Sequence, residues 1–313
     1  MHSKLNCISI LLTFSSLIVS CTSRSFHSET KQINGTIVNA SDPVSRSTVA
    51  IVFTNPAAMG PKIRVQTVCT GTLISENWVV TAAHCVLGSQ PPFSTLRIAF
   101  LQDVPKAQQE GTLEGALRGV DRVVVHNANR IASMCSNDQD PVNFAECNAR
   151  SEPPTPFYDL ALIRFKDKFA NGHQPARLPE PNLKMDGKST LVTAGYGLKK
   201  DQNEDSKRVT GVLTKIESSQ FQADWSHSQE FLVQNTEAAG NCHGDSGGPI
   251  YLSTAHEVLT LVGVTSRGDT VCGVKNGPVV YSDLRQHLNW VACNAGLKKE
   301  ACIEETNQTK RLF

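Results

Sequence analysis

The sequence predicts a fold built almost entirely of β-strands, with one helix near the C-terminus. From about residue 33 onward, short runs rich in Val, Ile and Leu recur between Gly, Pro, Asn and Ser, which is typical of strands joined by turns. Residues 282–295 differ, because their apolar side chains recur near helical spacing and Gly296 follows as a stop. This pattern alone is compatible with barrels or with a sandwich. The clearest strand-like runs are residues 48–53, 78–81, 122–125, 160–165, 191–193, 258–264 and 279–281.

The composition supports a packed globular protein. The 313-residue chain has a formal net charge of +1, with 40% hydrophobic and 19% charged residues. It carries no block of like charge, so the composition gives no reason to expect a nucleic-acid partner.

The N-terminus is typical of an export signal. Lys4 precedes a mainly apolar stretch at residues 8–19, which is shorter than the roughly 20 apolar residues of a membrane span. We expect residues 1–20 to be a signal peptide and residues 21–32 a linker or pro-segment, in a protein that is secreted or held in the cell envelope, at the periplasm or outer membrane surface. Residues 17–21, Leu-Ile-Val-Ser-Cys, resemble a bacterial lipobox, which would make Cys21 a lipid-bearing residue and the only membrane contact. The alternative is an ordinary cleavage site beside an incidental cysteine.

Cysteine spacing predicts disulfides. Of ten cysteines, Cys7 lies in the signal and Cys21 at the lipobox, and the other eight form four sequence-adjacent pairs. Export implies an oxidising compartment, where such pairs become disulfides. A zinc site is not expected, because no Cys-x-x-Cys or histidine cluster is present. We interpret residues 127–156 as a long surface loop that is closed by its own disulfide, between Cys135 and Cys147. The four pairs are Cys69 with Cys85, Cys135 with Cys147, Cys242 with Cys272, and Cys293 with Cys302.

Three motifs carry the chemistry. Residues 81–85 read Thr-Ala-Ala-His-Cys, residues 158–163 read Tyr-Asp-Leu-Ala-Leu-Ile, and residues 244–249 read Gly-Asp-Ser-Gly-Gly-Pro. Together, and in this order along the chain, they resemble the chymotrypsin-like serine proteases. The resemblance implies two six-stranded antiparallel β-barrels with a C-terminal helix over residues 33–298, followed by a tail at 299–313. It also implies a monomeric serine endopeptidase that acts on proteins or peptides and needs no cofactor.

The resemblance assigns a role to each motif residue. Ser246 is the expected nucleophile, His84 its general base and acid, and Asp159 the residue that orients His84. Backbone N–H groups of Gly244 and Ser246 are expected to form the oxyanion hole. A catalytically silent homologue that acts as a binding module stays open as the alternative, because the chain departs from the family at its N-terminus and at Val279.

Activation and specificity are predicted from the same resemblance. Asp245 is expected to pair with a new N-terminus made by an activating protease, and Ile33 is favoured as that terminus over Gln32 and Ile37. A protease active without this cut is the alternative. Cys69–Cys85 and Cys242–Cys272 match family disulfides.

The expected substrate-binding positions lack the charge of a trypsin-like site. Gly240 stands where trypsin has an aspartate, and Val279 replaces a glycine. Ser266 and Gly268 lie on the expected wall strand, where Arg267 stands in place of the usual Trp. We therefore expect cleavage after small or medium uncharged side chains.

Overall fold

The computed structural model covers most of the region that the three motifs span. It describes residues 35–54, 64–87, 93–126, 159–185, 190–198, 210–218, 221–224, 229–235, 240–254, 258–268, 272 and 277–298. The predictions for the signal peptide, the linker, Cys21, Ile33, the loop at 127–156 with Cys135 and Cys147, and the tail with Cys302 lie outside these residues.

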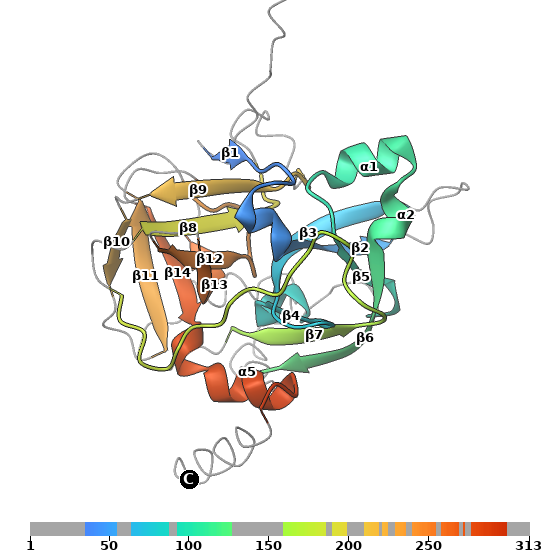
Figure 1. The fold of residues 1–313 in the computed structure, drawn as a ribbon. Coiled ribbons are helices and arrows are strands. Elements are labelled where there is room, and N and C mark those ends of the chain that lie inside the picture. Colours follow the sequence, from blue (N-terminus) through green and yellow to red (C-terminus); the bar gives the residue numbers. More distant parts are fainter. Residues whose placement is uncertain are drawn as a thin grey trace, which may run out of the picture.

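A closed barrel of six antiparallel strands forms the first half of the fold, on the right of Figure 1. Its neighbour order is β2-β3-β4-β7-β6-β5. Every residue of β4 is buried, as are the first six of β2, and these strands are rich in β-branched side chains that fit a packed barrel interior. The strands are β2 (Thr48–Thr54), β3 (Val65–Leu73), β4 (Trp78–Thr81), β5 (Leu96–Ala99), β6 (Leu117–Val125) and β7 (Ala161–Phe165).

A second antiparallel sheet forms the other half, with the order β1-β9-β8-β12-β13-β14-β11-β10. The prediction of an all-β fold with a C-terminal helix is confirmed. In the part of the chain that the structure describes, this sheet has eight strands, because the short strands β1 and β10 extend its two ends. The strands are β1 (Thr36–Ile37), β8 (Thr190–Gly195), β9 (Thr214–Ser218), β10 (Phe221–Asp224), β11 (Glu230–Asn235), β12 (Pro249–Ser253), β13 (Leu259–Gly268) and β14 (Pro278–Asp283).

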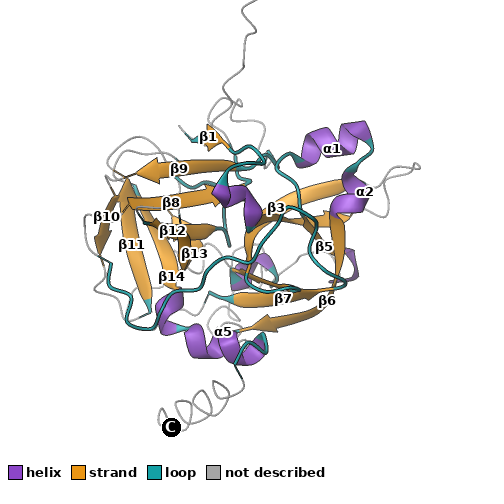
Figure 2. Cartoon of the chain, in the orientation of Figure 1, coloured by secondary structure: helices purple, strands orange, loops and turns teal. Residues whose placement is uncertain are grey.

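Short helices lie around the strands (Figure 2). The predicted C-terminal helix is present as η5 (Leu284–Gln286) followed by α5 (Leu288–Asn294). Two further helices, α1 (Val104–Glu110) and α2 (Leu113–Ala116), correct the expectation of a single helical stretch. Helix α1 begins after Asp103, whose carboxylate accepts the Lys106 N–H at 2.8 Å, and ends at Gly111 with φ of 76°. The 3₁₀ turns are η1 (Pro43–Arg46), η2 (Ala83–Cys85) and η3 (Phe93–Thr95).

The two halves share a buried interface. Tyr251 of β12 is fully buried, and its hydroxyl lies 2.7 Å from Ser47 Oγ and 3.1 Å from Thr48 Oγ1 at the start of β2. Helix α5 returns from the second half to lie beneath β6 and β7 of the first barrel (Figure 1), where the ring of Trp290 contacts the ring of His126. Each half therefore helps to bury the core of the other.

Among the described residues, no helix combines the length and apolar character that crossing a membrane would require.

Candidate active site

Strand register brings the histidine and aspartate motifs together. Strand β4 pairs antiparallel with β7, and Thr81 lies opposite Ala161. The end of β4 is therefore beside the start of β7, which places His84 next to Asp159 although 75 residues separate them.

Asp159 holds both the backbone and the ring of His84. Its Oδ1 accepts the His84 backbone N–H at 3.0 Å, and its Oδ2 lies 2.8 Å from His84 Nδ1. The carboxylate is fully buried, whereas 15% of the His84 side chain is exposed. Because a carboxylate only accepts hydrogen bonds, Nδ1 must carry a proton, and in the neutral ring Nε2 is left as the basic nitrogen.

Two serines of the second sheet complete the surroundings of Asp159. Ser266 on β13 donates its hydroxyl to Asp159 Oδ2 at 2.6 Å, and Ser282 on β14 donates to the Asp159 carbonyl oxygen at 3.3 Å. Ser266 is expected from the sequence to contact substrate, but the structure commits its hydroxyl to Asp159. No local signal could have shown this contact, because it joins residues 107 positions apart.

The charges of this pair shift each other's pKa. Burial opposes ionisation of both groups, but their mutual attraction and hydrogen bonds outweigh it. The pKa of His84 is therefore raised above its usual value by Asp159. The pKa of Asp159 is lowered by His84 and by the Ser266 hydroxyl, again against the effect of burial.

A tight loop before β12 carries Ser246. Gly244 and Gly247 flank it with φ of 96° and 78°. At Gly247 an added Cβ would lie 2.0 Å from Thr81 Oγ1 and 2.5 Å from the Thr70 carbonyl oxygen, so only glycine fits this approach to the first barrel. Thr70 in β3 fixes the loop from the other side, because its N–H donates to the Ser246 carbonyl at 2.9 Å.

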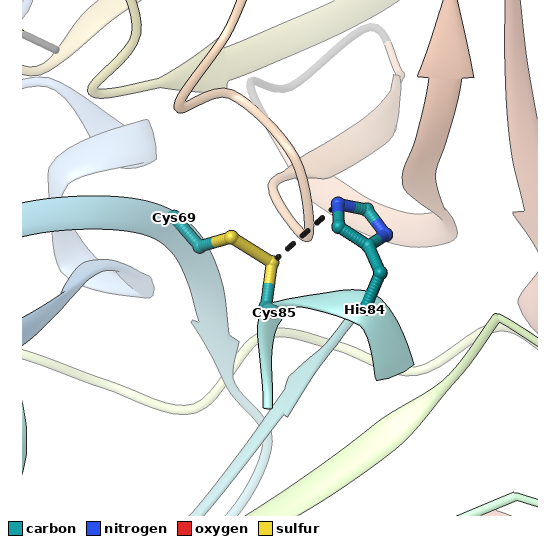
Figure 3. Close-up of side chains that lie close together, drawn as sticks. All are labelled: Cys69, His84 and Cys85. Carbon is teal, nitrogen blue, oxygen red and sulfur yellow. Dashed lines mark hydrogen bonds between the residues drawn. A yellow bond between two sulfur atoms is a disulfide. The ribbon is translucent and has the colours of Figure 1, made fainter. Parts of the chain in front are cut away.

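A disulfide places this loop beside the imidazole. Cys85 Sγ lies 3.9 Å from His84 Nε2, as the dashed line in Figure 3 marks, and 3.5 Å from the carbonyl oxygen of Ser246. The backbone of the half-buried Ser246 and the basic ring nitrogen therefore both lie next to the Cys85 sulfur.

The amides of this loop fall into two groups. The N–H groups of Asp245, Gly247 and Gly248 donate to backbone carbonyls at 2.8–2.9 Å. Gly244 and Ser246 donate their N–H groups to no other residue in the described ranges. The two donors expected for an oxyanion hole are thus without another acceptor in the described part of the chain.

The same region contains a cluster with the spacing of metal ligands. One ligand atom from each of Cys69, His84 and Cys85 lies within 4.8 Å of the others (Figure 3). A cysteine binds zinc through its thiolate sulfur, and here the two sulfurs are joined in the Cys69–Cys85 disulfide. The residues therefore do not fit a metal site.

Comparison with known proteins decides the family. The family model described as Trypsin matches residues 48–291, which is most of the chain. This chain belongs to the trypsin family. The matched range includes strands β2 to β14 and all three motifs.

Similar proteins come from several animals. The chain is 26% identical over 238 residues to phenoloxidase-activating factor 1 of Holotrichia diomphalia, covering 73% of this chain and 62% of that protein. It is 26% identical over 235 residues to chymotrypsin-like elastase family member 1 of Canis lupus familiaris, covering 71% of this chain and 79% of the relative. The match to urokinase-type plasminogen activator of Gallus gallus is 26% over 293 residues, covering 88% and 59%.

The matches cover only part of the longer relatives and come from animals. The chain spans 62% and 63% of the length of the two phenoloxidase-activating factors. The animal relatives also give no support to the bacterial origin and lipid anchor that residues 17–21 suggested.

Within this trypsin-family chain, Asp245 is fully buried in the nucleophile loop. Its Oδ1 accepts the Gly197 N–H and its Oδ2 accepts the Cys242 N–H, both at 2.8 Å. A Cβ at Gly197 would lie 2.6 Å from this carboxylate, so the glycine leaves room for it. The expected partner Ile33 is outside the described residues.

The remaining substrate-binding predictions fall on or near β13 and β14. Gly268 pairs with Val279 across these strands, and Val279 packs partly buried against the core of the second sheet. An added Cβ at Gly240 would meet no atom of the described residues within 4 Å.

Two disulfides join described cysteines. They are Cys69–Cys85 and Cys242–Cys272, the two pairings that the family resemblance implied. Cys293 is also disulfide-bonded, to a cysteine outside the described residues.

Proposed function

We propose that this chain is a serine endopeptidase that hydrolyses peptide bonds through an acyl-enzyme on Ser246. One observation supports this above the others. In a member of the trypsin family, Asp159 holds the His84 ring with its basic nitrogen toward the loop that carries Ser246.

The proposed reaction follows from the proton positions. His84 Nε2 takes the hydroxyl proton of Ser246 as Oγ attacks the substrate carbonyl, and His84 then donates this proton to the leaving amine. Asp159 stabilises the imidazolium that exists between these steps, because its buried carboxylate already bonds Nδ1. A water activated by the same ring hydrolyses the acyl-enzyme and restores Ser246.

The developing negative charge needs preorganised donors. The N–H groups of Gly244 and Ser246 are proposed for this task, since both remain unused by the loop itself. One such donor contributes about 2.7–4 kcal/mol to the stability of the transition state.

The specificity proposal is cleavage after small or medium uncharged residues. It is supported by Gly240, which brings no charge and whose added Cβ would meet no described atom within 4 Å, and by Val279, whose side chain occupies the place of a glycine. Digestion of a denatured protein followed by sequencing of the new termini tests it. Predominant cleavage after Lys or Arg would contradict it.

Export and activation belong to the same proposal. We propose a secreted zymogen that is cut before Ile33, so that the new terminus reaches Asp245. Two relatives are named as phenoloxidase-activating factors. On that ground we propose that this chain acts on a protein substrate in a protease cascade. Intact-mass and N-terminal sequencing of the natural protein test the cut, and they also test the lipid predicted on Cys21.

Labelling with a fluorophosphonate probe tests the catalytic proposal directly. The full chain, after activation, should be labelled stoichiometrically, and Ser246→Ala should abolish labelling while leaving the thermal unfolding midpoint nearly unchanged. Ser45→Ala is a control, since it removes a serine hydroxyl that donates to the Ala40 and Asp42 carbonyl oxygens, away from Asp159, and should keep the labelled residue. Failure of the activated wild-type chain to label would instead support a catalytically silent homologue.

A further inference from the structure

An ion pair bridges two strands beside the proposed triad. Arg267 on β13 donates from Nη1 to Glu230 Oε1 at 2.6 Å and from Nη2 to Oε2 at 2.8 Å. Glu230 is on β11, and strand β14 lies between these two strands. Both side chains are largely buried, with 25% and 12% exposed, so this two-bond pair holds the guanidinium in one place.

The fixed guanidinium also contacts Ser266. Arg267 Nη1 lies 3.4 Å from Ser266 Oγ, and a guanidinium has donors but no acceptor. The Ser266 oxygen must therefore accept at this contact, and its single proton is directed to Asp159 Oδ2, 2.6 Å away. Donors thus converge on Asp159 from two sides, from Arg267 through the Ser266 hydroxyl and from Nδ1 of the His84 ring.

We propose that Arg267, held by Glu230, is a positioning residue that orients the Ser266 hydroxyl toward Asp159 and sets the net charge that His84 experiences. This inference rests on the proposed function. It adds two residues outside the three motifs to the machinery, with opposite charges and therefore opposite effects on the basicity of His84.

Other charged or titratable groups lie on the elements next to Asp159, and they are the same in every variant below. From β14, Asp283 is neutralised by Arg285, whose Nη2 lies 2.5 Å from Oδ2. His126 follows β6 and His287 precedes α5, and burial lowers the pKa of these rings to about 3 and about 4, so both are neutral above pH 5. Only the charges of Arg267 and Glu230 are changed in these variants.

The two charge-removing variants should move the pH at which activity is lost in opposite directions. Removing the Arg267 charge makes the surroundings of Asp159 more negative, which favours the imidazolium form of His84 and moves the loss of activity to higher pH. Removing the Glu230 charge leaves Arg267 uncompensated, disfavours the imidazolium, and moves the loss of activity to lower pH. A purely structural pair would instead lower stability and activity in both variants without opposite movements along the pH axis.

The experiment measures the rate of fluorophosphonate labelling from pH 5 to 9 in Arg267→Gln, Glu230→Gln and Arg267→Lys. For each variant the rate at pH 5.5 is divided by its own plateau rate. We expect this ratio to fall about three- to tenfold in Arg267→Gln, because contacts of 3.4, 2.6 and 2.8 Å link the lost charge to the His84 ring, and to rise in Glu230→Gln. Arg267→Lys keeps the charge, so its ratio should stay close to that of the wild type.

The outcomes separate this inference from the proposed function. If wild-type protein labels but the ratios in the two Gln variants are unchanged or move in the same direction, the positioning role is overturned. If wild-type protein does not label at any pH, the proposed function fails, and the His84 imidazole is then titrated by NMR in the same variants. Opposite displacements of that titration support the inference, and coincident titrations overturn it.

Discussion

Two buried histidines should make the stability of this protein fall between pH 7 and pH 5. His126 and His287 are 5% and 4% exposed, and their ring centroids lie 5.0 Å apart. The indole of Trp290 covers His126 at 4.4 Å. Protonating either ring would place a buried positive charge inside this cluster of aromatic rings.

The direction in which the free energy of unfolding changes with pH follows from the pKa of each ring. Burial, with the nearby His287, lowers the pKa of His126 to about 3, and burial lowers the pKa of His287 to about 4 despite the opposing charge of Asp283. An unfolded histidine titrates near 6.5, so between these limits the unfolded chain binds more protons than the folded one. The free energy of unfolding therefore falls as the pH is lowered through about 6.5. Each ring should contribute a loss of about 2 kcal/mol between pH 7 and pH 5.

Other titrating groups act differently. The pKa of His84 is raised, so its contribution to stability is present at low pH and is lost as pH rises. Asp159 has a lowered pKa, so its contribution is lost only as pH falls below the range of an ordinary carboxyl. Comparison of a variant with its parent removes both effects, since neither group changes.

Urea denaturation at pH 7 and pH 5, followed by tryptophan fluorescence, measures the effect. In a Ser246→Ala background, which prevents self-digestion, we compare the parent with His126→Leu. The parent should lose about 2 kcal/mol more than this variant between the two pH values, because only the parent carries that ring.

A second variant separates titration from packing. Val291→Ala removes a fully buried apolar side chain from α5 and should lower stability equally at both pH values. If His126→Leu showed the same drop as its parent from pH 7 to pH 5, the argument from burial would be wrong.

Two further predictions concern the loop of Ser246. Gly247→Ala should lower the free energy of unfolding by about 3 kcal/mol or more and abolish fluorophosphonate labelling, because its Cβ would lie 2.0 Å from Thr81 Oγ1. Gly172→Ala is its control: Gly172 also has positive φ, at 87°, but its added Cβ would meet no described atom within 4 Å, so urea denaturation should show a loss of only about 1 kcal/mol. Replacing Cys242 and Cys272 by Ala should lower stability by about 3–4 kcal/mol in the same assay, since their disulfide closes a loop of 30 residues. An unchanged urea midpoint in this double variant would contradict that expectation.

Local sequence patterns predicted much of the secondary structure. The run at residues 78–81 coincides with β4, and six further predicted runs overlap strands of the structure. Apolar periodicity missed α1 and α2, which have seven and four residues and are too short to show a clear repeat. For α1 the signal was in the caps, since Asp103, Pro105 and Gly111 are typical of helix ends.

The sequence by itself determined the class of fold and the three motifs, because strand patterning and motif chemistry are local properties of the chain. Only the tertiary structure decided how these motifs meet. The pairing of β4 with β7 brings Asp159 to His84, and the same fold turns the Ser266 hydroxyl onto Asp159. Such contacts depend on strand register and on packing between the two halves. Both arise from many weak interactions along the whole chain, so no local sequence pattern predicts them.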